Sequence, residues 1–303
     1  MNNKNSAEAS IGTRMLLAID LVKKIRRLHT LREKDPVPEE LRGWFHYSPP
    51  IKPRAYLGLG VSEIANRYCE TRRDIYLRRV ARVRISTRPA PLQNGAAIHR
   101  VFRVASEKTR EIIFSRDIIE RLETELRRSS STLSNICGRE ILGLCTDLYK
   151  KLLVTWVSEI IKSRSIYGGD LVATLPWLSE IRVDGSLIGL SDRLSVDAIV
   201  NPLVVAEIKT GAEREFHRLS LAGYALAIES NLEIPVDYGV LIYVSNSPGS
   251  GVEIRYDVHY ISPDLRREFI DARDEVIDMI LSGRDPGKSR ECPDTCPFKE
   301  VCG

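Results

Sequence analysis

Glutamine is almost missing from this sequence of 303 residues, in which Gln93 is the only one. Charged residues reach 28%, and the two features together are typical of heat-adapted proteins, which avoid thermolabile amides. No apolar run approaches the roughly 18 residues that a membrane span requires, and the N-terminus lacks the pattern of a signal peptide. We therefore expect a cytoplasmic protein with no membrane partner.

The net charge of +4 is too small to indicate a partner by itself. Arginine is nevertheless concentrated in a helix expected over residues 61–80, where Tyr68 and Tyr76 are interleaved with Arg67, Arg72, Arg73, Arg78 and Arg79. Arginine binds phosphates and tyrosine stacks on unpaired bases, so this pattern fits a nucleic-acid surface. A solvated helix face explains the same pattern about equally well.

Six cysteines in a cytoplasmic protein favour metal or cluster binding over disulfides, with hyperthermophile proteins as the exception. Cys292, Cys296 and Cys302 lie together in a short tail marked by proline. Zinc sites and cubane iron-sulfur clusters commonly use four cysteines, and spacing alone separates the two poorly. Cys69 is the best fourth ligand, because neighbouring arginines favour its thiolate.

The remaining cysteines, Cys137 and Cys145, lie among apolar residues and are expected to be free, buried packing residues. They belong to a region, residues 93–161, that is predicted to be helical almost throughout. Another amphipathic helix is expected over residues 1–35, and a proline-rich linker follows it. His99 falls in the first helix of the 93–161 region, where a lone histidine is more often a core or surface residue than a metal ligand.

Two β-branched runs, Leu194 to Val200 and Leu203 to Ile208, predict neighbouring strands joined by a tight turn at Asn201-Pro202. Other strands and helices are expected around this pair. Their order predicts an α/β fold with a mixed sheet covered by helices. The further strands are expected at 180–183, 187–190, 237–244 and 252–261, and the helices at 213–228 and 263–281.

Glu207 and Lys209 are two residues apart on the second of these strands, so their side chains project from the same face. Such a pair is most often an ordinary ion pair. If Asp192 lies across from it, two carboxylates can bind Mg²⁺ or Mn²⁺, which activates water and polarises a phosphoryl oxygen. Lys209 can then stabilise the charge that develops on phosphorus.

Several short motifs occur together from about residue 60 to the end of the chain. In this order they resemble the CRISPR-associated, RecB-like nucleases of the Cas-four family, and most closely its archaeal Csa-one branch. The first predicted helix lies outside the resemblance. The motifs are Arg67-Tyr68-Cys69, Gly95-x3-His99, Gly189-x2-Asp192, Glu207-x-Lys209, Ser220-x3-Tyr224 and the cysteines of the tail.

The resemblance implies a PD-(D/E)xK nuclease core in residues 166–285. A helical region, 1–165, would contribute Cys69 and His99, and a tail, 286–303, would pack with the Cys69 helix. The resemblance also favours a [4Fe-4S] cluster over zinc. The implied cluster ligands are Cys69, Cys292, Cys296 and Cys302.

The same resemblance assigns roles to individual residues. His99, Asp192 and Glu207, with the backbone carbonyl of Ile208, become the ligands of Mn²⁺ or Mg²⁺, and Lys209 becomes the catalytic cation. Tyr224 is implied to contact DNA or to support the site, with Arg72 and Arg73 as further DNA-binding residues. The family usually carries glutamine where this chain has Ser220, which puts the orientation of DNA in question.

The implied activity is exonucleolytic cleavage of single-stranded DNA ends. In CRISPR adaptation it would process prespacers for the Cas-one and Cas-two integrase. Two alternatives remain from the sequence: a repair nuclease that works with a helicase, and a non-cutting iron-sulfur subunit that binds DNA ends. The oligomeric state is open, a homo-oligomer included.

Overall fold

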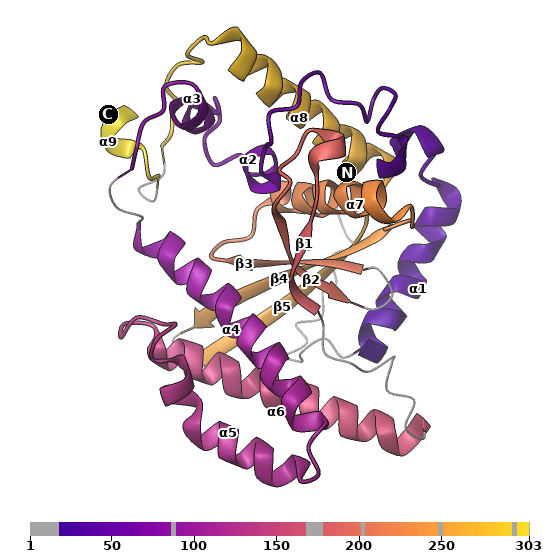
Figure 1. Ribbon diagram of the computed structural model, residues 1–303, viewed down its shortest axis with the longest axis vertical. Coiled ribbons are helices and arrows are strands. Elements are labelled where there is room, and N and C mark those ends of the chain that lie inside the picture. Colours follow the sequence, from indigo (N-terminus) through magenta and orange to yellow (C-terminus); the bar gives the residue numbers. More distant parts are fainter. Residues whose placement is uncertain are drawn as a thin grey trace, which may run out of the picture.

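The computed structural model describes residues 18–85, 89–167, 178–200, 204–247, 251–292 and 296–302. Two sequence predictions lie outside these residues: the first part of the N-terminal helix and the turn at Asn201-Pro202. A mixed β-sheet lies at the centre of the molecule, with helices on both faces (Figure 1). Within the described chain, no helix combines the length and the apolar character needed to cross a bilayer.

Five strands of the described chain form one sheet in the order β1-β2-β3-β4-β5. Neighbouring strands are antiparallel except β3 and β4, which are parallel. A parallel pair needs a crossover connection, and helix α7 provides it. The prediction of a mixed sheet is thus confirmed. The bounds are β1 Leu178–Val183, β2 Leu194–Val200, β3 Val204–Thr210, β4 Tyr238–Ser247, β5 Gly251–Tyr260 and α7 Arg218–Leu232.

Both faces of the sheet are buried, and alternate residues of β3 show this most clearly. Ala206 and Ile208 belong to a core shared with α4 and α6, whereas Val205 belongs to a second core shared with α2, α7 and α8. In Figure 1, α4, α5 and α6 lie on one side of the sheet and α7 and α8 on the other. The bounds are α2 Val61–Ala65, α4 Ala90–Ile113, α5 Ile118–Leu133, α6 Leu142–Tyr167 and α8 Pro263–Ser282.

A buried ionic network ties the N-terminal segment to the second core. Arg42 donates to Asp237 (2.5 Å) and to Glu229 (2.9 Å), and Arg266 lies 2.7 Å from the other oxygen of Glu229. Helix α1 (Ala18–Lys34) runs along β5, the edge strand, and Arg32 from α1 adds a 2.7 Å contact to Asp237. Two short 3-10 turns, Glu39–Leu41 and Gly43–Phe45, flank Arg42.

The single helix predicted over residues 61–80 is wrong, because the chain breaks into α2 and a second short helix, α3 (Arg73–Arg79). Arg72 precedes α3 in the left-handed conformation, with a φ of 57°. Its guanidinium donates to the carbonyls of Glu63 (3.3 Å) and Ile64 (2.9 Å) at the end of α2. The buried side chain therefore satisfies the end of one helix while its backbone begins the next.

The predicted strand at 187–190 is also wrong. A 3-10 turn, Ser186–Ile188, occupies this segment and ends at Gly189, whose φ of 78° glycine adopts readily. A side chain at Gly189 would press against Pro53, with a Cβ only 2.8 Å from the ring. Glycine is thus required here both for the backbone and for close packing.

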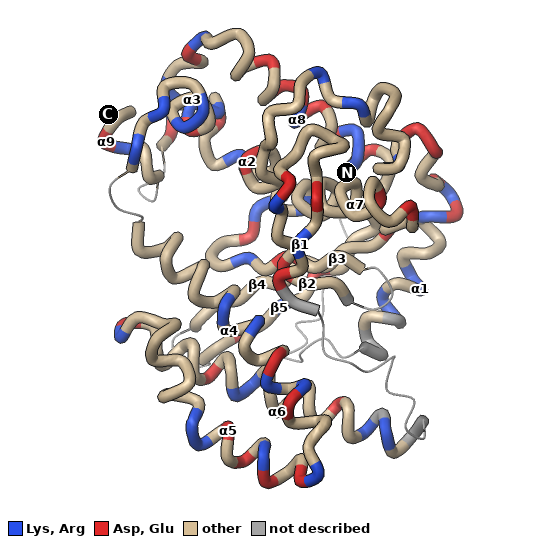
Figure 2. The backbone as a smooth tube through the Cα atoms, viewed as in Figure 1, with Lys and Arg blue, Asp and Glu red and all other residues tan. Residues whose placement is uncertain are grey.

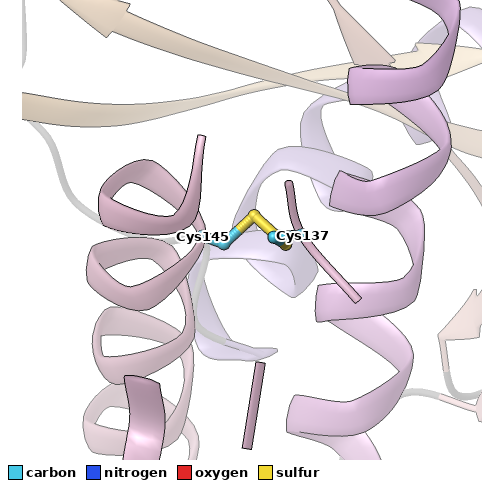
Figure 3. Close-up of a disulfide and its surroundings, with 2 residues drawn as sticks. All are labelled: Cys137 and Cys145. Carbon is cyan, nitrogen blue, oxygen red and sulfur yellow. A yellow bond between two sulfur atoms is a disulfide. The ribbon is translucent and has the colours of Figure 1, made fainter. Parts of the chain in front are cut away.

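Cys137 and Cys145 form a disulfide between the end of α5 and the beginning of α6 (Figure 3). The expectation that they are free packing residues is therefore wrong, although both are buried as expected. The connection between the two helices folds back so that the sulfurs meet. Apolar surroundings in the sequence indicated burial but carried no information about this pairing.

The C-terminal tail lies against α3. Thr71 donates to the carbonyl of Gly287 (2.8 Å), and Arg73 forms a two-pronged contact with Asp285 (2.9 and 2.8 Å). Arg78 lies over the ring of Phe298, 5.8 Å from its centroid. A last short helix, α9 (Lys299–Cys302), follows. Segments more than 200 residues apart in sequence are thereby held side by side (Figure 1).

Candidate functional site

Strands β2 and β3 separate where the polar residues begin. Their backbone pairing extends from Val200 and Val204 to Ala198 and Ala206. One step further, a side chain continues the connection: Asp197 Oδ2 accepts a hydrogen bond from the backbone N–H of Ile208 (2.8 Å). Asp197 therefore lies on β2 at the level of Glu207 on β3, with its carboxylate in the opening between the strands.

His99 reaches this carboxylate from α4. Its Nδ1 lies 2.8 Å from Asp197 Oδ1. Gly95, one turn earlier, allows the helix to approach the end of β3, because a Cβ there would lie only 3.2 Å from the Thr210 hydroxyl. Burial lowers the pKa of His99, but the neighbouring Asp197 carboxylate outweighs burial and leaves that pKa raised.

Glu207 and Lys209 form the other half of the cluster, with Nζ 2.8 Å from Oε1. The Glu207 side chain is only 8% exposed, and its second oxygen, Oε2, has no hydrogen-bond partner within the described residues. Burial raises the pKa of Glu207 to about 7, although Lys209 opposes the shift. Burial acts to lower the pKa of Lys209, and the Glu207 carboxylate reverses this and raises it.

Tyr224 on α7 is buried and lies near the charges of the cluster. Burial, followed by the nearby charges of Glu207 and Asp197, raises its pKa well above the ordinary value. Of the two predicted roles, the position fits support of the site better than contact with DNA. Ser220, one turn earlier, donates its hydroxyl to the carbonyl of His217 (2.7 Å) within the same helix. Its hydroxyl is therefore used in local structure.

Asp192, which the sequence analysis assigned as a metal ligand, lies away from this cluster. It is in the turn before β2, its side chain is 69% exposed, and its ion pair is a loose one with Arg193 at 3.9 Å. A strand rises about 3.3 Å per residue, so a position five residues before Asp197 is roughly 16 Å away along an extended chain. Asp197, and not Asp192, is therefore the aspartate that lies beside His99 and at the level of Glu207.

A signal for Asp197 was present in the sequence. In an antiparallel hairpin, residues opposite each other keep a constant sum of numbers, and pairing of Val200 with Val204 places position 197 opposite Glu207. An acidic residue in an otherwise apolar strand would then have been the natural partner. The Gly189-x2-Asp192 motif indicated Asp192 instead.

Two of the predicted DNA-binding residues point elsewhere. Arg72 is buried, and its guanidinium is directed into the protein, where it donates to the end of α2. Arg73 is occupied by Asp285 and also approaches Cys302 Sγ with its Nη1 at 3.7 Å. Arg72 thus links the start of α3 to the end of α2, and Arg73 holds the tail against α3.

A hollow of about 640 Å³ lies between the α3 region and the end of β3. Cys69, Cys292 and Cys296 border it at one end, and Cys302 adjoins α3 through Arg73. Burial, followed by the neighbouring Cys292, raises the pKa of Cys296 despite a backbone hydrogen bond that opposes the shift. Across the described ranges, no three or more His, Cys, Asp or Glu side chains are already drawn into metal-binding geometry.

At its other end the same hollow reaches the residues that follow Lys209. Thr210, Gly211, Ala212 and Arg214 border it there, and Arg78 borders it from α3. Arginine is frequent along α3, as the blue segments of Figure 2 show. The cysteines and the polar end of β3 thus share one continuous space with basic residues on its walls.

Comparison with known proteins gives consistent matches over nearly the whole chain. A family model described as CRISPR-associated exonuclease Csa1 matches residues 15–303. The CRISPR-associated exonuclease Csa1 of Saccharolobus solfataricus is 38% identical over 283 residues, which cover 88% of this chain and 92% of that protein. The protein of the same name from Thermoproteus tenax is 33% identical over 299 residues, covering 95% and 99%.

A solved structure, the crystal structure of SSO0001, aligns with 52% of this chain and 85% of that chain. Its sequence identity is 14% and its TM-score 0.24, values too low to bear on the fold or the function. The family model and the two relatives together cover both the polar end of β3 and the cysteine tail. The chain therefore belongs to the CRISPR-associated exonuclease Csa1 family.

Proposed function

We propose that this chain is a metal-dependent exonuclease that degrades single-stranded DNA from its ends. The observation that carries the proposal is the cluster of His99, Asp197, Glu207 and Lys209 at the opening between β2 and β3. Membership of a family whose relatives are named exonucleases supports the reaction class. We further assign the sheet to the PD-(D/E)xK class of RecB-like nucleases, related to the Cas-four proteins.

The residues at this opening fit a divalent cation such as Mn²⁺ or Mg²⁺. Glu207 Oε2 is a buried carboxylate oxygen without a hydrogen-bond partner within the described residues, which is an unfavourable state that a bound cation would relieve. Asp197 supplies a second carboxylate, and carboxylate oxygens are the ligands that these ions prefer. When bound, such an ion would polarise a phosphoryl oxygen and lower the pKa of a coordinated water.

Two further ligands are consistent with the geometry. If His99 donates its Nδ1 proton to Asp197, its Nε2 carries the lone pair, which is the arrangement common among metal-binding histidines. The N–H and C=O groups of one strand residue point to the same neighbouring strand. Since the N–H of Ile208 points to Asp197, its carbonyl faces the same opening.

Lys209 places a positively charged ammonium group in the cluster. The contact with Glu207 fixes the direction of its ammonium group, and most of the side chain is buried, so little side-chain entropy remains to be lost on binding a phosphate. From this position the ammonium can donate to a non-bridging oxygen as negative charge develops. Tyr224 is buried close enough for the charge of Glu207 to raise its pKa, and we assign it a supporting role.

We also propose that Cys69, Cys292, Cys296 and Cys302 hold a [4Fe-4S] cluster. The fit lies in the donor set: three of the four thiols border one hollow, and the fourth belongs to the segment that packs on α3. Zinc would use the same ligands. The cluster would brace the wall of the hollow through which a single strand reaches the polar end of β3.

The test uses the full chain purified without oxygen and incubated with Mn²⁺. Linear single strands labelled at one end should be degraded, whereas a circular single strand should survive. Glu207→Ala should abolish degradation without loss of the visible colour of the cluster. Glu215→Ala, an exposed acidic residue outside the cluster, is the matched control and should be unchanged. Equal degradation by the Glu207 and Glu215 variants would rule out the assigned site.

The biological setting needs a separate experiment. We propose that the ends trimmed by this chain are prespacers for the Cas-one and Cas-two integrase. Affinity purification of the tagged protein from its own cells should therefore recover integrase subunits. Recovery of a helicase instead would favour a repair nuclease. Tight DNA binding without cleavage under both Mn²⁺ and Mg²⁺ would indicate a subunit that only binds ends.

A further inference from the structure

A cluster of aromatic side chains lies between the hollow and α7. Tyr68, which borders the hollow and is 49% exposed, packs edge to face on Phe216, with ring centroids 4.9 Å apart. Its hydroxyl lies 2.9 Å from Nε2 of His217, and Nδ1 of His217 lies 3.3 Å from the hydroxyl of Tyr243. The buried His217 therefore connects two tyrosines, one of which reaches the open space.

The hydrogen bonds of His217 determine which of its nitrogens carries the proton. The backbone N–H of Arg214 can only donate, and it points at Nδ1 from 3.4 Å, so Nδ1 is an acceptor. Burial, followed by the positive charges of Lys209 and Arg214, lowers the pKa of His217 to about 4, and the ring is neutral near pH 7. The single ring proton is thus on Nε2, which donates to the Tyr68 oxygen.

This assignment leaves the proton of the Tyr68 hydroxyl available to another group. A phenol that accepts a hydrogen bond from a histidine keeps one donor, and here the phenol stands at the wall of the hollow. Tyr68 is close enough to Lys209 to influence the pKa of its ammonium group. Two arginines, Arg78 and Arg214, border the same hollow.

We infer that Tyr68 contacts the DNA strand, donating its hydroxyl to a non-bridging phosphate oxygen near the cleavage site, and that His217 is its positioning residue. A phosphate oxygen is an acceptor only and carries negative charge, so it matches both the free donor and the basic surroundings. The inference rests on the proposed function in one respect, that the ligand of the hollow is a single DNA strand.

The test measures binding without turnover, in the full chain carrying Glu207→Gln. Tyr68→Phe keeps the ring and its packing on Phe216 but removes the donor. Its affinity for a short fluorescent single strand should fall about tenfold, the usual effect of losing a hydrogen bond to a charged group. Tyr56→Phe, an exposed tyrosine outside the hollow, is the matched control and should change nothing.

A phosphate-by-phosphate series then identifies the contact. Methylphosphonate, which lacks the charged oxygen, replaces one linkage of the strand at a time. At the contacted linkage, Tyr68→Phe should no longer weaken binding, because the two changes remove the same interaction. If Tyr68→Phe weakens binding equally with every strand of the series, or does not weaken it at all, the inference is overturned.

The positioning role of His217 has its own pair of variants. Glutamine places an amide donor near the position of Nε2, so His217→Gln should preserve the dependence on Tyr68. Leucine has no donor, and His217→Leu should reproduce the effect of Tyr68→Phe and add nothing to it. Equal affinities of the two His217 variants would refute the positioning role, and if the leucine variant does not fold, the glutamine variant decides alone. Because affinity is measured without turnover, a failure of nuclease activity would appear separately, as uncut DNA in the unaltered protein.

Discussion

His99 and Asp197 are 98 residues apart in the sequence, and their side chains meet with Nδ1 2.8 Å from Oδ1. The contact joins helix α4 to strand β2 at the point where β2 and β3 separate. It brings an imidazole to two carboxylates, Asp197 and Glu207, which approach from different strands. Neither the helical region nor the sheet contains the whole cluster, so the site depends on the packing between them.

Asp197→Ala should strongly reduce DNA degradation, whereas Asp192→Ala should leave it nearly unchanged. Asp197→Ala removes a carboxylate from the opening and frees both His99 and the N–H of Ile208, so activity should fall by about 100-fold, as for other metal-site partners. Asp192→Ala removes an exposed carboxylate and should stay within about twofold of the unaltered protein. Initial rates with end-labelled single strands and Mn²⁺ provide the comparison. If only Asp192→Ala lost activity, the metal ligand would be Asp192, in the turn before β2, and not Asp197.

The difference between these two aspartates shows what the sequence could and could not predict. Alternation along β3 was enough to place Glu207 and Lys209 on one face, and Gly95 and His99 were recognisable as one turn of a helix. Choosing between Asp192 and Asp197 required the register of two strands. Register depends on the turn and on the pairing, which a motif read along one strand does not contain.

The other departures have the same origin in tertiary contacts. The arginines around α3 predicted a DNA surface. In the structure Arg72 donates to a carbonyl at the end of α2, and Arg73 donates to Asp285 in the tail. Cys137 and Cys145 were correctly expected to be buried, and only the fold-back between α5 and α6 brings their sulfurs together. In each case the outcome depends on a partner that only the folded chain brings into contact, and composition gives no indication of it.

The pH dependence of stability should reveal the burial of Glu207. Its pKa rises from 4.5 to about 7 on folding, so the folded protein binds the proton more tightly than the unfolded chain. This contribution is fully present below pH 4.5 and is lost as the pH rises through 7. In metal-free protein, Glu207→Gln should abolish this loss, which amounts to about 3 kcal/mol at most. Denaturant unfolding at pH 5 and pH 8, with chelator present, measures it. A stability difference between the two proteins that is the same at both pH values would contradict the buried carboxylate.

Arg214 and Arg72 should respond differently to salt when DNA binding is measured. Arg214 is exposed at the border of the hollow, and Arg214→Ala should weaken binding to single strands and reduce the salt slope by about 1. Arg72→Ala should leave that slope unchanged, because the buried guanidinium donates to backbone carbonyls. The second variant should instead lower stability, by about 1 to 3 kcal/mol for the buried carbonyls left without donors. Fluorescence titrations at several salt concentrations distinguish the two, and a reduced slope for Arg72→Ala would restore its predicted contact with DNA.

The cysteines should separate into two groups when each is replaced by serine. Cys69→Ser removes a proposed cluster ligand, so the anaerobically purified protein should lose its visible absorption and most of its bound iron. Cys137→Ser, at a buried disulfide that does not border the hollow, should keep both and instead lower the free energy of unfolding by about 2 to 3 kcal/mol. Iron analysis and denaturant unfolding of both variants make the comparison. If the unaltered protein is colourless and contains zinc, the four cysteines remain the ligands, but the metal that they bind is zinc and not an iron-sulfur cluster. Full iron content in Cys69→Ser would remove Cys69 from the set, because a cubane cluster that lacks one of its thiolate ligands is not expected to keep all of its iron.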